Sequence, residues 1–253
     1  MENRSKNKWR RHSIMNENKA LQGHLPDTSK FSETSLWDFV DNYHKVILKP
    51  SGGRRGKNIF KLSSLGDGMY KIHYEDKINL FLGRDNTYTY LMKMIGSRAY
   101  LIQRYIPLLT IIKSPFDIRV ITQKCTDSNT WSVTCKVAKV AGKGFIVTNN
   151  ELSGGSILKV EQAIQDSCLP ISTENIHFLL SEIDRVALIA AESLAGYYKE
   201  QRIFGFDIGV DKQGHVWIIE GNLRPSLSHF YKLGDKATYR TIREIQRRNL
   251  LTR

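Results

Sequence analysis

The segment FGFDIGVDKQGHVWIIEGN, residues 204–222, constrains the fold most strongly, because two alternating runs flank a polar, glycine-containing turn. Alternation of this kind predicts two antiparallel strands in a hairpin. With an even number of residues in the turn, Asp207 shares one face with Glu220 and Asn222. The same register gathers the apolar side chains on the opposite face: Phe206, Ile208, Val210, Trp217 and Ile219.

The oxygen-rich face of this hairpin carries two carboxylates and one amide. Such groups are hard ligands, suited to Mg²⁺ or Mn²⁺ and not to zinc, and these sites usually leave coordination positions open for substrate phosphates. The simpler alternative is a half-buried hairpin whose acidic face is solvated. We expect a metal site at Asp207, Glu220 and Asn222, because a candidate phosphate-binding loop lies elsewhere in the chain.

That loop follows a strand-like run in VILKPSGGRRGKNIF, residues 46–60, which ends on Lys49 and opens into glycines and arginines. Asn58 stands where a Walker motif needs a metal-binding Ser or Thr, and a strand rather than a helix follows, which excludes a dinucleotide fingerprint. A strand-end lysine before flexible glycines predicts a different phosphate clamp, in which backbone N–H groups close over the anion.

Four elements in order resemble the ATP-grasp superfamily: VILKPSGGRRGKNIF, YLIQRYI, FDIRV and GFDIGV…WIIEGN. The signatures LPDT, PFDIRV and VTNNELSGG are similar to the YheC/YheD-like, endospore coat-associated branch. The resemblance implies an α+β fold in which two lobes with antiparallel sheets clamp ATP. It also implies a division into a basic, loosely packed segment (1–20), an N-terminal region and first lobe with a glycine-rich lid (21–106), and a second lobe with the metal site and a basic C-terminal helix (107–253).

The resemblance also implies roles for individual residues. Lys49 binds the nucleotide phosphates, and the lid glycines are Gly52, Gly53 and Gly56. The hinge that reads adenine is formed by Gln103, Arg104, Tyr105 and Ile106. Asp207 serves both ATP and metal, beside Glu220 and Asn222, and the catalytic side chains are Arg119, Arg224 and Asn150. Asp117 is expected to orient Arg119, Asn149 is an alternative to Asn150, and Lys139 stands where the resemblance leads us to expect an arginine.

The implied activity is an ATP- and Mg²⁺-dependent carboxylate–amine ligase that forms an amide bond through an acyl phosphate. A net charge of +13 favours an acidic peptide or protein as the substrate that is extended. Two alternatives are a phosphotransferase built on the same lobes and a basic nucleic-acid-binding protein with a degenerate nucleotide site. No apolar run of about 18 residues exists, and the three cysteines are scattered, so we expect no membrane span and a cytoplasmic setting. The resemblance to the endospore coat-associated branch implies a link to sporulation.

Overall fold

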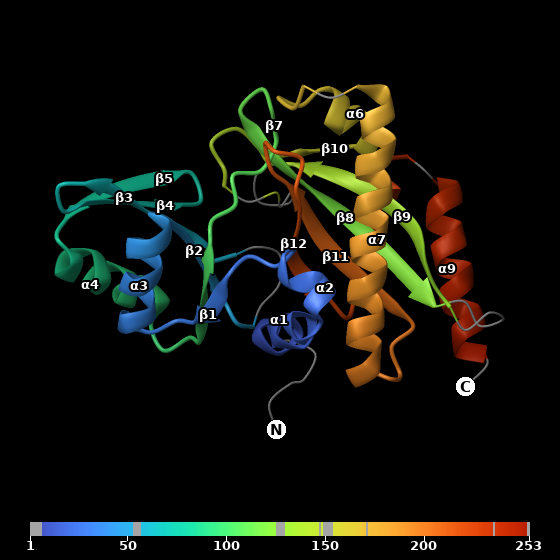
Figure 1. The fold of residues 1–253 in the computed structure, drawn as a ribbon, viewed down its shortest axis with the longest axis horizontal. Helices are drawn as coiled ribbons and strands as arrows, with labels where there is room; N and C mark the ends of the chain where they lie inside the picture. Colours follow the sequence, from blue (N-terminus) through green and yellow to red (C-terminus); the bar gives the residue numbers. More distant parts are fainter. Residues whose placement is uncertain are drawn as a thin grey trace.

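The chain folds into two lobes that lie side by side, each built on its own antiparallel sheet (Figure 1). The computed structural model describes residues 7–52, 57–124, 130–146, 148, 154–170, 172–234 and 236–251, without the side chains of 249–251. Within this part of the chain, no helix is both long and apolar enough to cross a membrane.

The first lobe contains a six-stranded sheet of order β1-β6-β2-β3-β4-β5. One face is covered by two helices, whose apolar side chains pack with Val46, Leu48 and Ile72 of the strands. The first of these helices begins in a capping box between Ser32 and Ser35. The elements are β1 (Thr28–Lys30), α3 (Glu33–Tyr43), β2 (Lys45–Pro50), β3 (Phe60–Gly66), β4 (Met69–Tyr74), β5 (Lys77–Leu82), α4 (Arg84–Ile95) and β6 (Tyr100–Arg104).

The second lobe contains a sheet of order β10-β9-β8-β11-β12, with β7 paired to β8. The long helix α7 (Thr173–Tyr197) crosses one face, as Figure 1 shows, and covers Ile118, Phe206 and the rest of the main core. Ile242 of the basic C-terminal helix α9 (Lys236–Leu251) packs on the opposite face. The other elements are β7 (Thr110–Ile111), β8 (Ser114–Lys124), β9 (Trp131–Val140), β10 (Ser156–Leu158), α6 (Val160–Gln165), β11 (Ile203–Val210), β12 (Val216–Asn222) and α8 (Ser228–Lys232).

A β-bulge at Ile219 corrects part of the expected hairpin register. Because Asp211 N–H donates to His215 O (3.1 Å), the turn holds residues 212–214, an odd number. Ile208 pairs with Ile218, but Asp207 pairs with Glu220, so Ile219 is the extra residue. Asp207 and Glu220 therefore share a face, as expected. The core side chains of β12 are Val216 and Ile218, and the expectation that Trp217 and Ile219 would join the core is wrong.

The N-terminal segment differs from our expectation of a loosely packed tail. From Asn7 onward it forms the helices α1 (Lys8–Glu17) and α2 (Lys19–Gln22), which lie between the lobes in Figure 1. Asn7 caps α1, Arg11 Nε donates to the Gly221 carbonyl (2.6 Å), and Ile218 N–H donates to His24 O (2.7 Å). The segment thus supplies partners to the outer edge of β12, which would otherwise be an unpaired edge.

Candidate active site

Lys49 reaches from the first lobe to the second. Its ammonium donates to Gln103 Oε1 (2.8 Å) and to the Ile219 carbonyl (3.1 Å), and its side chain is 6% exposed. The bulge gives Ile219 this role, because the extra residue turns its carbonyl away from the β11 ladder. Burial lowers the pKa of Lys49 to about 8, although Glu220 acts in the opposite direction. The predicted phosphate lysine therefore lies directly against the predicted metal strand.

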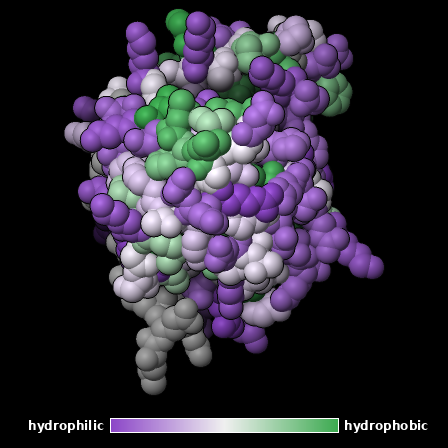
Figure 2. Space-filling view, turned by 90° about the vertical axis from the view of Figure 1, so that its left-hand side faces the viewer, coloured by the Kyte–Doolittle hydropathy of each residue, from purple (hydrophilic) through white to green (hydrophobic). Residues whose placement is uncertain are grey.

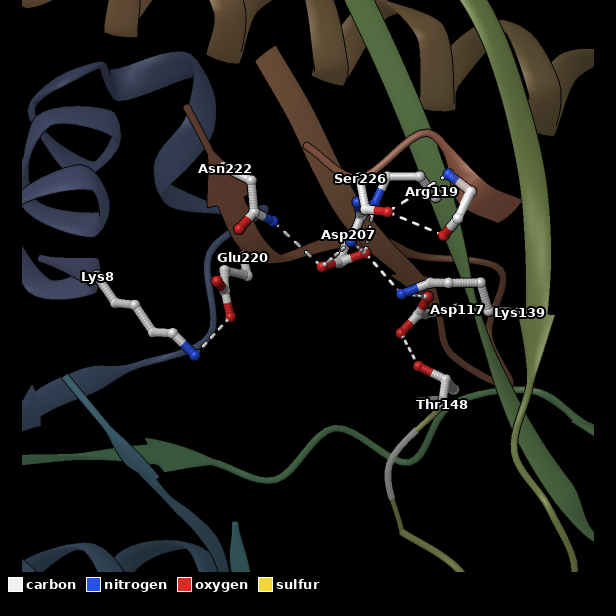
Figure 3. A network of polar contacts seen from close by, with 10 residues as sticks. Lys8, Asp117, Arg119, Lys139, Thr148, Asp207, Glu220, Asn222 and Ser226 are labelled. Carbon is white, nitrogen blue, oxygen red and sulfur yellow. Dashed lines mark hydrogen bonds and ion pairs between the residues drawn. The ribbon is translucent and has the colours of Figure 1, made fainter. Parts of the chain in front are cut away.

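Asp207 is the centre of a polar network on the sheet face opposite α7 (Figure 3). Arg119 donates Nε to Asp207 Oδ1 (2.9 Å) and Nη2 to Oδ2 (3.0 Å), a bidentate pair. Lys139 Nζ lies 2.7 Å from Oδ1, and the Asn222 amide donates to Oδ2 (3.3 Å). Burial opposes ionisation of this carboxyl, but the two cations outweigh it and hold the pKa of Asp207 well below its ordinary value.

Asp117 extends the network to the strand beside it, with a partner that differs from our expectation. Its carboxylate pairs with Lys139 (2.8 Å) and accepts a hydrogen bond from Thr148, whereas Arg119 is oriented by Asp207. Burial raises the pKa of Asp117, because Lys139 compensates only in part for the lost hydration. Lys139 thus joins both carboxylates, and it replaces the expected arginine as the cation of this strand.

Lys8 on α1 is a site residue that the sequence reasoning missed. Its ammonium lies 2.9 Å from Glu220 Oε2, and its side chain is 9% exposed. Burial opposes ionisation of Glu220, but Lys8 and then Lys49 lower the pKa of this carboxyl below its ordinary value. Lys8, Arg11 and Met15 recur at the spacing of one helix face and are all buried. This helical spacing could have predicted the buried face, but it is difficult to recognise among the six Lys and Arg residues of positions 1–20.

The predicted metal ligands have oxygen donors of the kind that a hard cation prefers, and both oxygens of Asp207 also accept from Arg119, Lys139 or Asn222. Within the described ranges there is no cluster of three His, Cys, Asp or Glu side chains suited to a metal, so the candidate set is two carboxylates and an amide. Asn222 turns its amide N–H toward Asp207, and its carbonyl oxygen points to the same side as Glu220 (Figure 3). An all-oxygen set of this kind fits Mg²⁺. Lys8 and Lys139 already neutralise part of its charge.

Several groups of the expected hinge, residues 103–106, already form contacts within the protein. Arg104 N–H donates to Asp27 O (2.9 Å), and Tyr105 N–H donates to Lys45 O (3.1 Å). The Gln103 side chain links Lys49 to Thr28, and Ile106 is buried. These two backbone N–H groups are therefore occupied, and the prediction that this segment reads adenine rests on its remaining groups.

The other predicted residues are distributed as follows. Gly52 is described and half-buried at the start of the loop, and Arg224 is exposed just after β12. Gly53, Gly56, Asn149 and Asn150 lie outside the described residues. The geometry thus brings together Lys49, Gln103, Arg119, Asp207, Glu220 and Asn222, and it adds Lys8, Asp117 and Lys139.

Comparison with known proteins agrees with this geometry. The family profile described as YheC/D like ATP-grasp matches residues 1–247. The chain belongs to this family. It is 28% identical over 233 residues to the endospore coat-associated protein YheD of Bacillus subtilis, covering 88% of this chain and 49% of that relative. It is 25% identical over 224 residues to YheC of the same organism, covering 86% and 59%. It therefore spans only about half to three fifths of these relatives.

Two solved structures have the same fold. Carboxyaminoimidazole ribonucleotide synthase of Aspergillus clavatus, complexed with ATP, superposes with a TM-score of 0.55 and 12% identity over 88% of this chain and 46% of that one. The ATP-grasp ligase PsnB, complexed with a minimal precursor, gives 0.51 and 14% over 90% and 55%. At these identities the likeness establishes the fold, which is α+β ATP-grasp.

Proposed function

We propose that this protein is an ATP- and Mg²⁺-dependent carboxylate–amine ligase. The observation that carries the proposal is the contact of the Lys49 ammonium with the Ile219 carbonyl at 3.1 Å. This contact joins a strand-end lysine of one lobe to the strand that carries Glu220 and Asn222 in the other. Family membership supports the same reading, because ATP-grasp relatives include ligases.

The charge of the site suits a polyphosphate. The site contains four cations (Lys8, Lys49, Arg119 and Lys139) and three carboxylates (Asp117, Asp207 and Glu220). All four cationic residues are 9% exposed or less, so their field acts with little screening by water. A buried excess of positive charge is stabilised by an anion that replaces the lost hydration.

The proposed reaction has two steps. A substrate carboxylate attacks the γ-phosphorus of ATP, and the bond to the bridging oxygen breaks, which gives ADP and an acyl phosphate. An amine then attacks the acyl carbon, phosphate leaves, and the amine proton passes to solvent. Both steps build negative charge on phosphate oxygens, so positioning and charge neutralisation supply most of the catalysis.

Different residues of this chain bind the phosphates and would hold the metal. Lys49 and Lys8 bind phosphates, and Arg119, which uses Nε and Nη2 on Asp207, offers Nη1 to the transferred group. Asp207 and Asn222 stay fixed through their mutual hydrogen bond. Asp207, Glu220 and Asn222 would hold Mg²⁺, which when bound neutralises the phosphates and orients them.

An acidic peptide or protein is the proposed acid substrate. The net charge of +13 attracts such a molecule over long distances. A sporulation-associated setting follows as a further proposal from the names of the two Bacillus subtilis relatives, and the cytoplasmic setting stays a prediction from the sequence.

The test is a product analysis with matched variants. The protein is incubated with ATP, Mg²⁺, a mixture of amino acids and a glutamate-rich peptide, and the products are separated by mass spectrometry. We expect ADP together with amide products heavier by one or more amino-acid residues. Lys49→Met should abolish both, whereas Lys113→Met, at an exposed lysine, should not. A phosphorylated peptide without amine incorporation would favour the phosphotransferase, and no ADP from any acid would contradict the proposal.

A further inference from the structure

The edge strand β5 exposes a row of large apolar side chains. Ile78, Leu80 and Leu82 are 58%, 58% and 64% exposed, while Phe81 between them packs on the core of the first lobe. Figure 2, which faces this lobe, shows an apolar patch in its upper half. Leu65 of β3 is also exposed (52%). A run of exposed apolar residues on an unpaired edge strand marks an interaction site, because water-exposed edges are normally blunted by charge.

The rest of this sheet face is cationic. Strands β2 to β5 contain five lysines and no Asp or Glu in the sequences KVILKP, FKLSSLG, MYKIHY and KINLFL. Lys45, Lys61 and Lys71 lie on the open face, and none of them forms an ion pair with any described residue. Burial, with help from Lys45 and Lys71, lowers the pKa of Lys61 to about 8. The Lys61 ammonium also lies over the Tyr105 ring, 3.6 Å from its centroid, and these four strands bring no carboxylate to the face.

The strand register places side chains of neighbouring strands in continuous rows across the sheet. One row crosses the strands as Lys45, Ser63, Lys71 and Leu80. The next row crosses as Gln103, Ile47, Lys61, His73 and Ile78. Because Gln103 holds Lys49, the second row runs from the candidate phosphate lysine to the apolar edge, a span of about 19 Å at the usual strand spacing.

We propose that the edge of β5, with Ile78, Leu80 and the adjacent Lys71 of β4, docks an extended, acidic and apolar segment of a polypeptide. The segment adds as a strand to the edge of β5, places apolar side chains on the exposed row and brings its carboxylates within reach of Lys71 on the neighbouring strand. Charge complementarity favours this occupant, since a second copy of the chain, with its net charge of +13, would bring further cations to Lys71. That the docked polypeptide is also the acid substrate rests on the proposed function.

A binding measurement without ATP tests docking separately from catalysis. The probe is a fluorescein-labelled twelve-residue peptide of alternating glutamate and valine, and its anisotropy is followed with the full chain. Comparison peptides replace glutamate by lysine, or introduce proline at alternate positions to remove backbone donors. Leu80→Asp and Lys71→Glu alter the docking face, and Ile112→Ser and Lys113→Glu are matched controls at exposed positions of the second lobe.

We expect saturable binding of the glutamate peptide, weakened at least about tenfold by Leu80→Asp and by Lys71→Glu and changed less than about twofold by the controls. Both comparison peptides should bind at least about tenfold more weakly. Hydrogen exchange should slow in β5 on addition of the peptide. Docking would be overturned by any of three results: binding of the variants equal to that of the wild type, a preference for a random single-stranded RNA of the same length, or no saturable binding of the peptide. ADP formation without peptide binding would overturn docking but leave the proposed function intact. Peptide binding without any ADP formation would support docking but contradict the proposed function.

Discussion

Replacing Lys49 by methionine should strengthen the fold while it weakens nucleotide binding. Methionine keeps the unbranched side chain and removes the charge, so the packing of this buried position changes little. Below pH 8 the ammonium is charged in a site that disfavours charge, because burial lowers the pKa of Lys49 from 10.5 to about 8. The same ammonium is the group that we expect to bind phosphate.

The structure gives the size of both effects. Lowering the pKa of Lys49 from 10.5 to about 8 means that the folded state destabilises the charged ammonium by roughly 3 kcal/mol. This free-energy cost is fully present below pH 8, where the ammonium is charged in the folded state. The variant leaves Gln103 Oε1 and the Ile219 carbonyl without their donor, which costs about 1 kcal/mol each. The net result is a gain of about 1 kcal/mol. Loss of one charged hydrogen bond to phosphate should weaken ATP binding about ten- to a hundredfold.

Urea denaturation of the nucleotide-free protein in a chelator measures stability, and isothermal titration with ATP and Mg²⁺ measures affinity. The stability gain should shrink as the pH rises from 8 toward 10.5, because the wild-type ammonium then loses its proton in the folded state first. Lys113→Met serves as the control and should leave both quantities unchanged. A variant that is clearly less stable at pH 7, or that binds ATP as tightly as the wild type, would refute this reasoning.

Three further perturbations test the site and its supports. Asp207→Asn leaves two buried cations without their shared anion, so it should lower the free energy of unfolding by about 2–4 kcal/mol, measured in urea, and eliminate ADP formation. Gly205→Ala places a Cβ 2.4 Å from the Pro225 side chain and should cost about 1–3 kcal/mol, and a melting temperature equal to that of the wild type would contradict this contact. Lys8→Met should reduce ATP affinity about tenfold or more by titration, whereas an unchanged affinity would remove Lys8 from the phosphate site and leave its pairing with Glu220 purely structural.

The sequence predicted the strands and the order of the main elements because those depend on local pattern. Alternation placed Asp207 on the opposite face of its strand from Phe206 and Ile208, and in the structure those two apolar side chains lie in the core. These features require only the period of each segment and the rule that apolar faces pack together.

Other features could not be obtained from local pattern. The bulge at Ile219 moves Glu220 onto the site face, and nothing in the alternation of residues 216–222 specifies where the extra residue falls. Lys8 belongs to the site only because α1 packs beside the edge of β12. The partner of Asp117 was also misjudged, since Lys139 comes from the neighbouring strand and lies nearer than Arg119.

The amino-acid order alone fixed which segments are strands or helices and which side chains are available for phosphate and metal. Only the packed chain decided which charges meet, because Coulomb energy and desolvation depend on distances between residues as far apart in the chain as Lys49 and Ile219 or Lys8 and Glu220. Local periodicity carries no information about such distances, so the long-range ion pairs had to come from the tertiary structure.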